Sequence, residues 1–179
     1  IEKEANQLDK MIADVLQVSR LEANSQTLSL QQQPLQDIVD HVLNDATFEA
    51  KQLKKQLHVT GSAEVFIQCD EALIASALEN LLRNAIHYAT STISLSLKHS
   101  DKVSIEICDD GPGVPDSQLS KLCEPFFRQS DARDRVTGGT GLGLAIAKNA
   151  IMAHGGSLTL ANKPHGGLCA TISLPIIKE

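Results

Sequence analysis

The sequence predicts an α/β fold, a two-layer sandwich in which helices cover one face of a mixed β-sheet. Three segments repeat apolar residues every three or four positions, as amphipathic helices do, and several short segments alternate apolar with polar residues. The chain has 179 residues and is 42% hydrophobic, which is enough to bury the core of one such domain plus an appendage. We therefore expect one α/β domain preceded by a separate N-terminal segment.

The overall charge argues against two classes of partner. The formal net charge is -6, so the chain offers no basic surface for nucleic acid or for anionic lipid. No apolar run is long enough to cross a bilayer, and no signal peptide opens the sequence. The sequence starts at Ile1 in the middle of a repeating pattern, so we expect it to be a piece of a longer protein.

The four cysteines are far apart in the sequence and form no C-x-x-C pair. They are Cys69, Cys108, Cys123 and Cys169, and none has histidine neighbours at the spacing of metal ligands. We predict that all four are reduced thiols in the core of a cytoplasmic domain.

The N-terminal segment, residues 1–23, has a heptad pattern. Its apolar positions are Ile1, Ala5, Leu8, Ile12 and Val15, with polar residues on the other faces. This pattern predicts one helix of a coiled coil or bundle that needs a second helix to cover it. The alternative is that the helix packs on its own domain.

The remaining elements follow in chain order. Strands are expected near Leu28–Leu30, Leu57–Thr60, Val65–Gln68, Thr92–Lys98, Lys102–Cys108, Ser157–Ala161 and Leu168–Leu174, all in one mixed sheet. Helices are expected near residues 35–52, 71–89 and 142–154. Pro34 suits the first turn of the first helix, Asp70 suits the N-cap of the second, and His154 suits the C-terminus of the third.

The second predicted helix carries an unusual polar face. Asn80, Asn84, His87 and Tyr88 are three or four positions apart, so they project from one side, next to the apolar stripe. Amides are poor helix formers, and their neutral oxygens suit Mg²⁺. The alternative is an ordinary solvated face.

Two glycine-containing motifs follow later in the chain. In the first, Asp109 ends a predicted strand and Gly111 and Gly113 come next; a carboxylate there can accept a hydrogen bond from a ligand that lies against backbone. In the second, Gly139, Gly141 and Gly143 lead into a helix whose N-terminal N–H groups favour a phosphate. Either motif could instead be only a turn.

Taken together and in this order, Asn-x-x-x-Asn, Asp-x-Gly-x-Gly and Gly-x-Gly-x-Gly resemble the ATP-binding domain of sensor histidine kinases, which has the Bergerat-type nucleotide fold. The resemblance identifies residues 24–179 as the catalytic ATP-binding domain and residues 1–23 as the second helix of the dimerisation domain. Residues 124–128 look like the phenylalanine box of this family. Gly155-Gly156 and Gly166-Gly167 look like its closing glycines.

This resemblance implies that ATP and Mg²⁺ are the cofactors. It implies that Asn84 coordinates Mg²⁺ with support from Asn80, that Asp109 accepts from the adenine amino group, and that Tyr88 stacks near the base. It also implies that the three glycines of the second motif wrap the phosphates and that the segment from Phe126 to Gly138 is a mobile lid. The family often has Lys or Arg where this chain has His87, whose charge varies near neutral pH.

The resemblance assigns one set of residues to nucleotide contact and another to charge in the lid. The first set is Asn80, Asn84, His87, Tyr88, Asp109, Gly111, Gly113, Phe126, Arg133, Gly139, Thr140, Gly141, Leu142, Gly143 and Leu144. The second set, the candidates for a catalytic role, is Arg128, Arg133 and Arg135.

The phosphoacceptor histidine of the resembled family lies in a Ser-His-Glu context. None of the six histidines of this sequence has that context, so we expect the acceptor to lie outside it. The resemblance further implies a homodimer when the dimerisation helices are complete and a response regulator as partner, with no nucleic acid and no membrane contact by this part. It implies a cytoplasmic location for this part of a protein of the bacterial inner membrane.

Two functions are alternatives to that of a histidine kinase. ATPases of the gyrase, Hsp90 and MutL group carry a glutamate where Asn80 stands, and an amide cannot take a proton from water. Glu79 is the nearest carboxylate in the sequence but lies about 100° round the helix. The other alternative is a non-catalytic dimerisation module with a nucleotide pocket.

Overall fold

The computed structural model describes residues 12–13, 15–16, 19, 28–128 and 140–177. Its main sheet has the strand order β2 (Gln56–Thr60), β4 (Thr92–His99), β5 (Lys102–Asp109), β7 (Leu168–Pro175) and β6 (Ser157–Asn162). β2 and β4 are parallel and the other neighbours are antiparallel, which confirms a mixed sheet.

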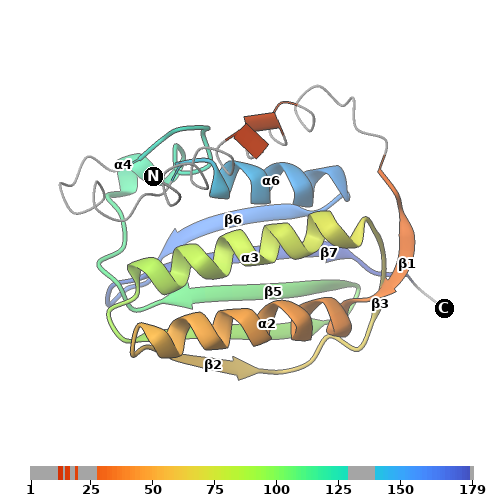
Figure 1. Cartoon of the computed structure of the whole chain (residues 1–179), viewed down its shortest axis with the longest axis horizontal. Coiled ribbons are helices and arrows are strands. Elements are labelled where there is room, and N and C mark those ends of the chain that lie inside the picture. Colours follow the sequence, from red (N-terminus) through yellow and green to blue (C-terminus); the bar gives the residue numbers. More distant parts are fainter. Residues whose placement is uncertain (1–11, 14, 17–18, 20–27, 129–139, 178–179) are drawn as a thin grey trace.

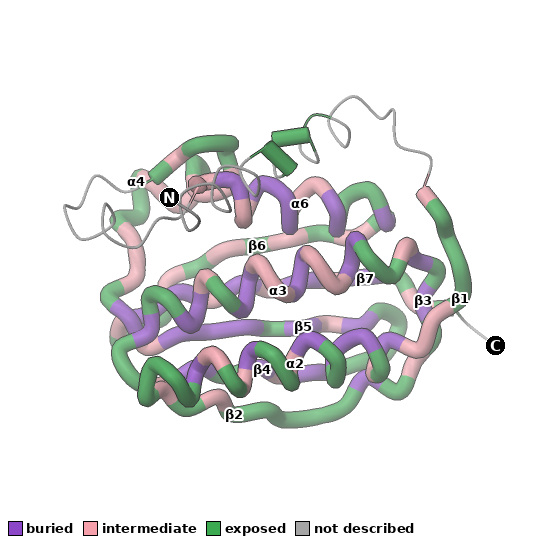
Figure 2. The backbone as a smooth tube through the Cα atoms, viewed as in Figure 1, coloured by how far each residue is buried: buried purple, intermediate pink, exposed green. Residues whose placement is uncertain are grey.

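Three helices lie side by side across one face of this sheet (Figure 1). They are α2 (Leu35–Gln52), α3 (Glu71–Tyr88) and α6 (Gly143–Ala153), each within two residues of its predicted bounds. On β5 the residues that face the helices, such as Ile105 and Ile107, are buried, whereas Glu106 between them is exposed. Figure 2 shows the same alternation of buried and exposed backbone along the helices. The two-layer α/β sandwich is therefore confirmed.

The prediction of a single sheet was wrong in one region. β1 (Gln31–Pro34) and β3 (Phe66–Cys69) form a separate two-stranded antiparallel sheet. Leu28–Leu30 precedes β1 and is not a strand. The backbone of Gln31–Pro34 pairs with β3 instead, although its side chains show no apolar pattern that would predict a strand. Pro34 ends β1 in an extended conformation, with φ −69° and ψ 116°, and α2 begins only at Leu35. A short helix, α4 (Asp116–Leu119), was not predicted.

The ends of α3 are held by polar groups from elsewhere in the chain. Asp70 is its N-cap, as predicted, and accepts a hydrogen bond from the backbone N–H of Leu73. At the other end, Lys55 Nζ donates to the carbonyls of Ile86 and His87 at 2.6 and 3.2 Å, which complements the helix dipole. His154 is the C-cap of α6, also as predicted, and its Nε2 accepts from the Asp70 N–H at 2.9 Å. Side chains thus fix α3 relative to its neighbours at both ends.

Five residues of the N-terminal segment are described, and all are helical. Among them Ile12, Val15 and Leu16 are exposed. Ile1, Ala5 and Leu8 of the heptad pattern lie outside the described residues.

None of the helices that the structure describes combines the length and the apolar character needed to cross a membrane.

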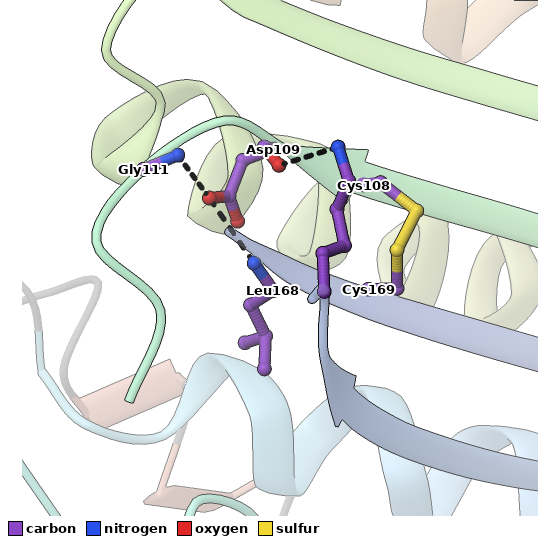
Figure 3. The surroundings of a disulfide bond; sticks show 6 residues. Cys108, Asp109, Gly111, Leu168 and Cys169 are labelled. Atoms are coloured by element: carbon purple, nitrogen blue, oxygen red, sulfur yellow. Dashed lines mark hydrogen bonds between the residues drawn. A yellow bond between two sulfur atoms is a disulfide. The ribbon is translucent and has the colours of Figure 1, made fainter. Parts of the chain in front are cut away.

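The prediction of four reduced cysteines was wrong for one pair. Cys108 and Cys169 form a disulfide between β5 and β7 (Figure 3). They are 61 positions apart in the sequence, but the antiparallel register places them directly opposite each other, with their Cα atoms 4.1 Å apart. Sequence spacing carries no information about such a pairing. Cys69 and Cys123 are free thiols, and burial, aided by Glu71 and Asp70, raises the pKa of Cys69 to about 11.

Candidate functional site

Asp109 is the last residue of β5, and its side chain is only 3% exposed. Its Oδ1 accepts two backbone hydrogen bonds, from Gly111 at 2.8 Å and from Leu168 at 3.3 Å (Figure 3). Within the described part of the chain, Oδ2 has no hydrogen-bond partner. The carboxylate is therefore fixed through one oxygen and retains an acceptor for a ligand.

The surroundings of Asp109 raise its pKa above the ordinary value. Burial is the largest cause, and the nearby charge of Asp110 adds to it; the two backbone N–H groups and Lys163 oppose the shift. A desolvated carboxylate of this kind gains more from a ligand N–H donor than an exposed one would.

Asp110, the next residue, connects the end of β5 to the loop after α3. Its carboxylate accepts from the backbone N–H groups of Thr90, Ser91 and Thr92 at 2.8, 2.9 and 3.0 Å, and from the Ser91 hydroxyl at 2.7 Å. Burial alone would raise the pKa of Asp110, but these donors outweigh it and hold the pKa far below its usual range. This role of Asp110 was not predicted, although the sequence places a second Asp directly before Gly111.

Asn162, at the end of β6, holds the loop after the first glycine motif. Its Oδ1 accepts from Val114 N at 3.0 Å, and its Nδ2 donates to Val114 O at 2.7 Å and to Asp116 at 2.8 Å. The neighbouring Lys163 Nζ reaches the Asp109 carbonyl at 3.4 Å. Neither residue belongs to a recognisable motif, so the sequence offered no signal for them.

The glycines of the first motif are required by the packing of the chain itself. A Cβ on Gly111 would lie 2.2 Å from the Tyr88 carbonyl oxygen. Gly113 has φ +71°, and a Cβ there would lie 2.8 Å from Asn162 Oδ1. These glycines allow the chain after Asp109 to turn tightly against the end of α3. The packing of the chain alone therefore explains why both positions are glycine, without any ligand.

Asn84 lies together with Asp109 in one small pocket between α3, α6 and the sheet. Leu81, Leu144, Leu160 and Leu168 are among its apolar lining residues. The side chain of Asn84 makes no hydrogen bond within the described residues. The structure thus brings together two of the predicted site residues, from α3 and from β5.

Asn80, one turn earlier on α3, faces the start of α6. Its Nδ2 donates to the Ser76 carbonyl at 2.9 Å, and its Oδ1 lies so close to Gly143 that an added Cβ would be 3.0 Å away. His87 and Tyr88 lie at the exposed end of α3, with their rings edge to face and 4.7 Å apart, and they do not line the described pocket.

The first turn of α6 has backbone donors but no side-chain cap. The helix begins at Gly143 with no capping hydrogen bond and no acidic residue in its first turn. Among the described residues no side chain caps its first N–H groups, which suits them to an anion. Leu142 is fully buried and packs with Ile146, so its side chain belongs to the core, whereas Leu144 lines the pocket.

The remaining predicted residues lie on the approach to α6 or outside the described residues. Gly141 has φ +73°, and its carbonyl accepts from Phe126 N at 2.9 Å. Phe126 is itself in the left-handed region, at φ +65°, and is exposed. Thr140 Oγ1 accepts from Leu142 N at 3.3 Å, and a Cβ on Gly141 would meet the side chain of Arg128. Arg133, Arg135 and Gly139 lie outside the described residues.

One cluster of metal-binding residue types is present in the described part of the chain, outside this pocket. Glu106, Cys108 and Cys169 have ligand atoms within 4.8 Å of one another. Because the two sulfurs are bonded to each other, the cluster is not a metal centre in this state.

Comparison with known proteins identifies the family. The profile of the family described as "Histidine kinase-, DNA gyrase B-, and HSP90-like ATPase" matches residues 69–178, which is more than half of the chain. The sensor histidine kinase CpxA of Escherichia coli strain K12 is 39% identical over 183 residues, covering all of this chain and 39% of CpxA. BaeS of the same strain, a signal transduction histidine-protein kinase, is 32% identical over all of this chain and 39% of its own length. The chain therefore spans well under half of these relatives.

The match to CpxA covers the whole of this chain and therefore includes residues 48–50 and 131–135, which from the sequence we predict to resemble the sensor kinase of the Cpx system. Solved structures share the fold. A full-length ShkA in complex with AMPPNP matches 99% of this chain and 37% of its own, with a TM-score of 0.84 and 23% identity. The histidine kinase AdeS of Acinetobacter baumannii matches 98% of this chain and 82% of its own, with a TM-score of 0.79 and 24% identity.

Proposed function

Because the chain belongs to the histidine kinase-, DNA gyrase B- and HSP90-like ATPase family, we propose that it is the ATP-binding catalytic portion of a two-component sensor histidine kinase. Such a protein transfers the γ-phosphoryl group of ATP to a histidine, here one outside this sequence, and from there to an aspartate of a response regulator.

The observation that carries this proposal is the arrangement around the pocket that Asp109 and Asn84 share. Asp109 offers a buried acceptor suited to the adenine amino group, and the uncapped start of α6 offers N–H donors suited to phosphates. One ligand with a base at one end and phosphates at the other satisfies both ends, and ATP is such a ligand.

The residues on α3 fit Mg²⁺. Asn84 has a side chain without a partner among the described residues, and Asn80 directs its oxygen toward the start of α6. Neutral amide oxygens beside a phosphate site suit an ion that keeps most of its waters. We assign Asn84 to Mg²⁺ with Asn80 in support; the ion, when bound, neutralises charge on the phosphates. Arg128, Arg133 and Arg135 are the candidates for further positive charge.

Kinase activity is favoured over ATP hydrolysis. Position 80 holds an amide, which cannot act as the general base of the gyrase-type ATPases. The curated relatives named above are called sensor or signal transduction histidine kinases. By analogy we propose that residues 1–23 belong to a dimerisation domain and residues 24–179 to the catalytic domain. We further propose that the whole protein is a homodimer of the bacterial inner membrane, with this part on the cytoplasmic side and a response regulator as its partner.

The test combines binding with phosphoryl transfer. Calorimetry should detect ATP binding that tightens with Mg²⁺; absence of binding would refute the proposal.

Incubated alone with γ-labelled ATP and Mg²⁺, the chain should form no phosphohistidine, because transfer needs a nucleophile within about 3–3.5 Å. A longer chain that has the acceptor helix, but a nucleotide site disabled by the change equivalent to Asn84→Ala, should become labelled if subunits mix. Labelling of any of the six histidines present here would place the acceptor within this sequence instead.

A further inference from the structure

The Cys108–Cys169 disulfide lies at the end of the ladder that positions Asp109. The pairing of β5 with β7 runs from Lys102 opposite Pro175 to Cys108 opposite Cys169, and the disulfide joins this last pair. Beyond this pair, Leu168 N donates a hydrogen bond to the Asp109 carboxylate. The covalent link therefore adjoins the contact that holds the binding carboxylate.

The disulfide and the carboxylate point to opposite sides of the sheet. Successive side chains of a strand alternate, so Asp109 lines the pocket under the helices while Cys108 faces the other way. Figure 3 shows the Asp109 carboxylate directed away from the sulfur atoms. Any effect of the disulfide on a ligand must therefore pass through the backbone of this pair of strand ends.

The strand ends are packed closely enough to transmit such an effect. A Cβ on Gly167 would lie 2.1 Å from the Asp109 carbonyl oxygen, so the residue immediately before β7 packs closely against Asp109. The bond from Leu168 is the longer of the two that Asp109 Oδ1 accepts, 3.3 Å against 2.8 Å. It is the contact that would weaken first if the two strand ends separated.

We propose that Cys108 and Cys169 form a redox modification site that exchanges with small thiols and disulfides, and that its oxidised form holds Asp109 in its nucleotide-binding position. The effect on nucleotide rests on the proposed function, because it requires ATP to bind at Asp109.

The exchange balances as ordinary thiol–disulfide chemistry. A small thiolate attacks the sulfur of Cys169, which is half-buried, whereas Cys108 is only 6% exposed. The bond between the two sulfurs breaks, and Cys108 leaves as a thiolate and takes up a proton. A second small thiolate then attacks the sulfur of the small thiol in the mixed disulfide, which releases Cys169 and a small disulfide. In total two small thiols are oxidised and the protein disulfide is reduced; oxidation by a small disulfide such as oxidised glutathione is the reverse.

The experiment compares the whole chain oxidised by oxidised glutathione with the same chain reduced by dithiothreitol. Alkylation followed by mass spectrometry measures the fraction of the chain that contains the disulfide. Calorimetry measures ATP affinity, and amide hydrogen exchange is measured at Leu168 without nucleotide. We expect faster Leu168 exchange and about threefold to tenfold weaker ATP binding on reduction, the range expected for the loss of one hydrogen bond. The Cys108→Ser/Cys169→Ser variant should behave like the reduced chain under both conditions, and Cys123→Ser, the matched control, should keep the response.

The outcomes separate this inference from the proposed function. Failure of the disulfide to form under oxidation, or equal Leu168 exchange and equal ATP affinity in the two states, would overturn the inference and leave ATP binding standing. Absence of ATP binding in both states, with Leu168 exchange still responding, would overturn the proposed function and the effect on nucleotide, but would support the coupling of the disulfide to Asp109.

Discussion

The two ends of the proposed nucleotide site differ in how the protein satisfies its own polar groups. At the Asp109 end, Gly111 after β5 and Leu168 at the start of β7 donate to the Asp109 carboxylate, and Asn162 at the end of β6 pairs with Val114 in the loop that follows. Around the start of α6, the first backbone N–H groups have no capping side chain, and Asn80 Oδ1 has no hydrogen bond within the described residues.

The same contrast holds between two helices of one layer. α3 begins with the cap Asp70 and an acidic first turn, which neutralise its N-terminus. α6 begins with Gly143 and, within the part of the chain that the structure describes, has neither. A helix start without its own anion is suited to a ligand's anion. We infer that the Asp109 end is built in advance and provides specificity for the base, while the α6 end is completed by phosphates and Mg²⁺.

The substitution with the largest expected effect is Asp109→Asn. The amide can still accept from Gly111 and Leu168 through one oxygen, but it offers a donor where the second carboxylate oxygen stood. Loss of a charged hydrogen bond costs about 1.5–3 kcal/mol, so calorimetry should show about tenfold to a hundredfold weaker ATP binding. The thermal midpoint should not fall, because the raised pKa of Asp109 means that its charge costs stability above that pKa.

The matched control is Asp45→Asn, which removes one negative charge from an exposed position on α2. It should leave ATP affinity unchanged. An Asp109→Asn variant that binds ATP as tightly as the parent would show that this end does not recognise the base, and the comparison between the two ends would fail.

At the other end, Asn84→Ala should remove the gain in ATP affinity that Mg²⁺ provides, about tenfold, and leave metal-free binding mostly intact. The reason is that Asn84 is assigned to the metal and not to the nucleotide. Calorimetry with and without Mg²⁺ on Asn84→Ala and Asn80→Ala separates the two amides. Equal losses with and without metal would indicate that Asn84 contacts the nucleotide or only supports the helix.

The sequence predicted the helices and the main strands because their patterns are local. The repeat of apolar residues in α3, and the alternation along β5, are readable without knowing any partner. Pairings between distant segments were not readable in this way. Gln31–Pro34 has no apolar alternation and forms a strand only because β3 lies beside it, and the disulfide depends on the register of β5 with β7.

The same distinction between local patterns and contacts of distant segments applies to the candidate site. Asn84 and Asp109 were identified from motifs, and the structure places them in one pocket. Asn162 and Lys163 were missed because each acts on a loop about fifty positions away through a side chain with no motif around it. Leu168 was missed for a different reason, since its backbone N–H acts and its side chain gives no sign of this.

A smaller effect is expected for Asp110→Ala, and it should fall on stability. The variant loses the acceptor for Thr90, Ser91 and Thr92, which costs about 2 kcal/mol, or roughly 4–8 °C in Tm by calorimetric melting. Because the folded-state pKa of Asp110 is lowered, its contribution is complete above the unfolded pKa of about 3.9 and is lost as pH falls through the lowered folded-state value. The difference in Tm between variant and parent should therefore be full at pH 7 and shrink below about pH 4; a difference that stays constant with pH would show that the charge of Asp110 is not the cause.

The smallest effect is expected for Asn162→Ala, which tests how far the Asp109 end of the proposed site extends along the chain. The alanine cannot pair with Val114 N and O, so the loop after Gly113 loses its connection to β6. The variant also loses the bond from Nδ2 to Asp116, but all of these bonds lie on a partly exposed loop, so we expect a loss of about 1 kcal/mol of stability and faster amide exchange at Val114. ATP affinity should fall less than threefold, because Asp109 keeps its bonds to Gly111 and Leu168. The exposed Asn44→Ala on α2 is the control and should change neither quantity. A loss of ATP affinity as large as that of Asp109→Asn would mean that the loop from Gly113 to Asp116 also takes part in recognition of the base. The Asp109 end of the site would then include this loop.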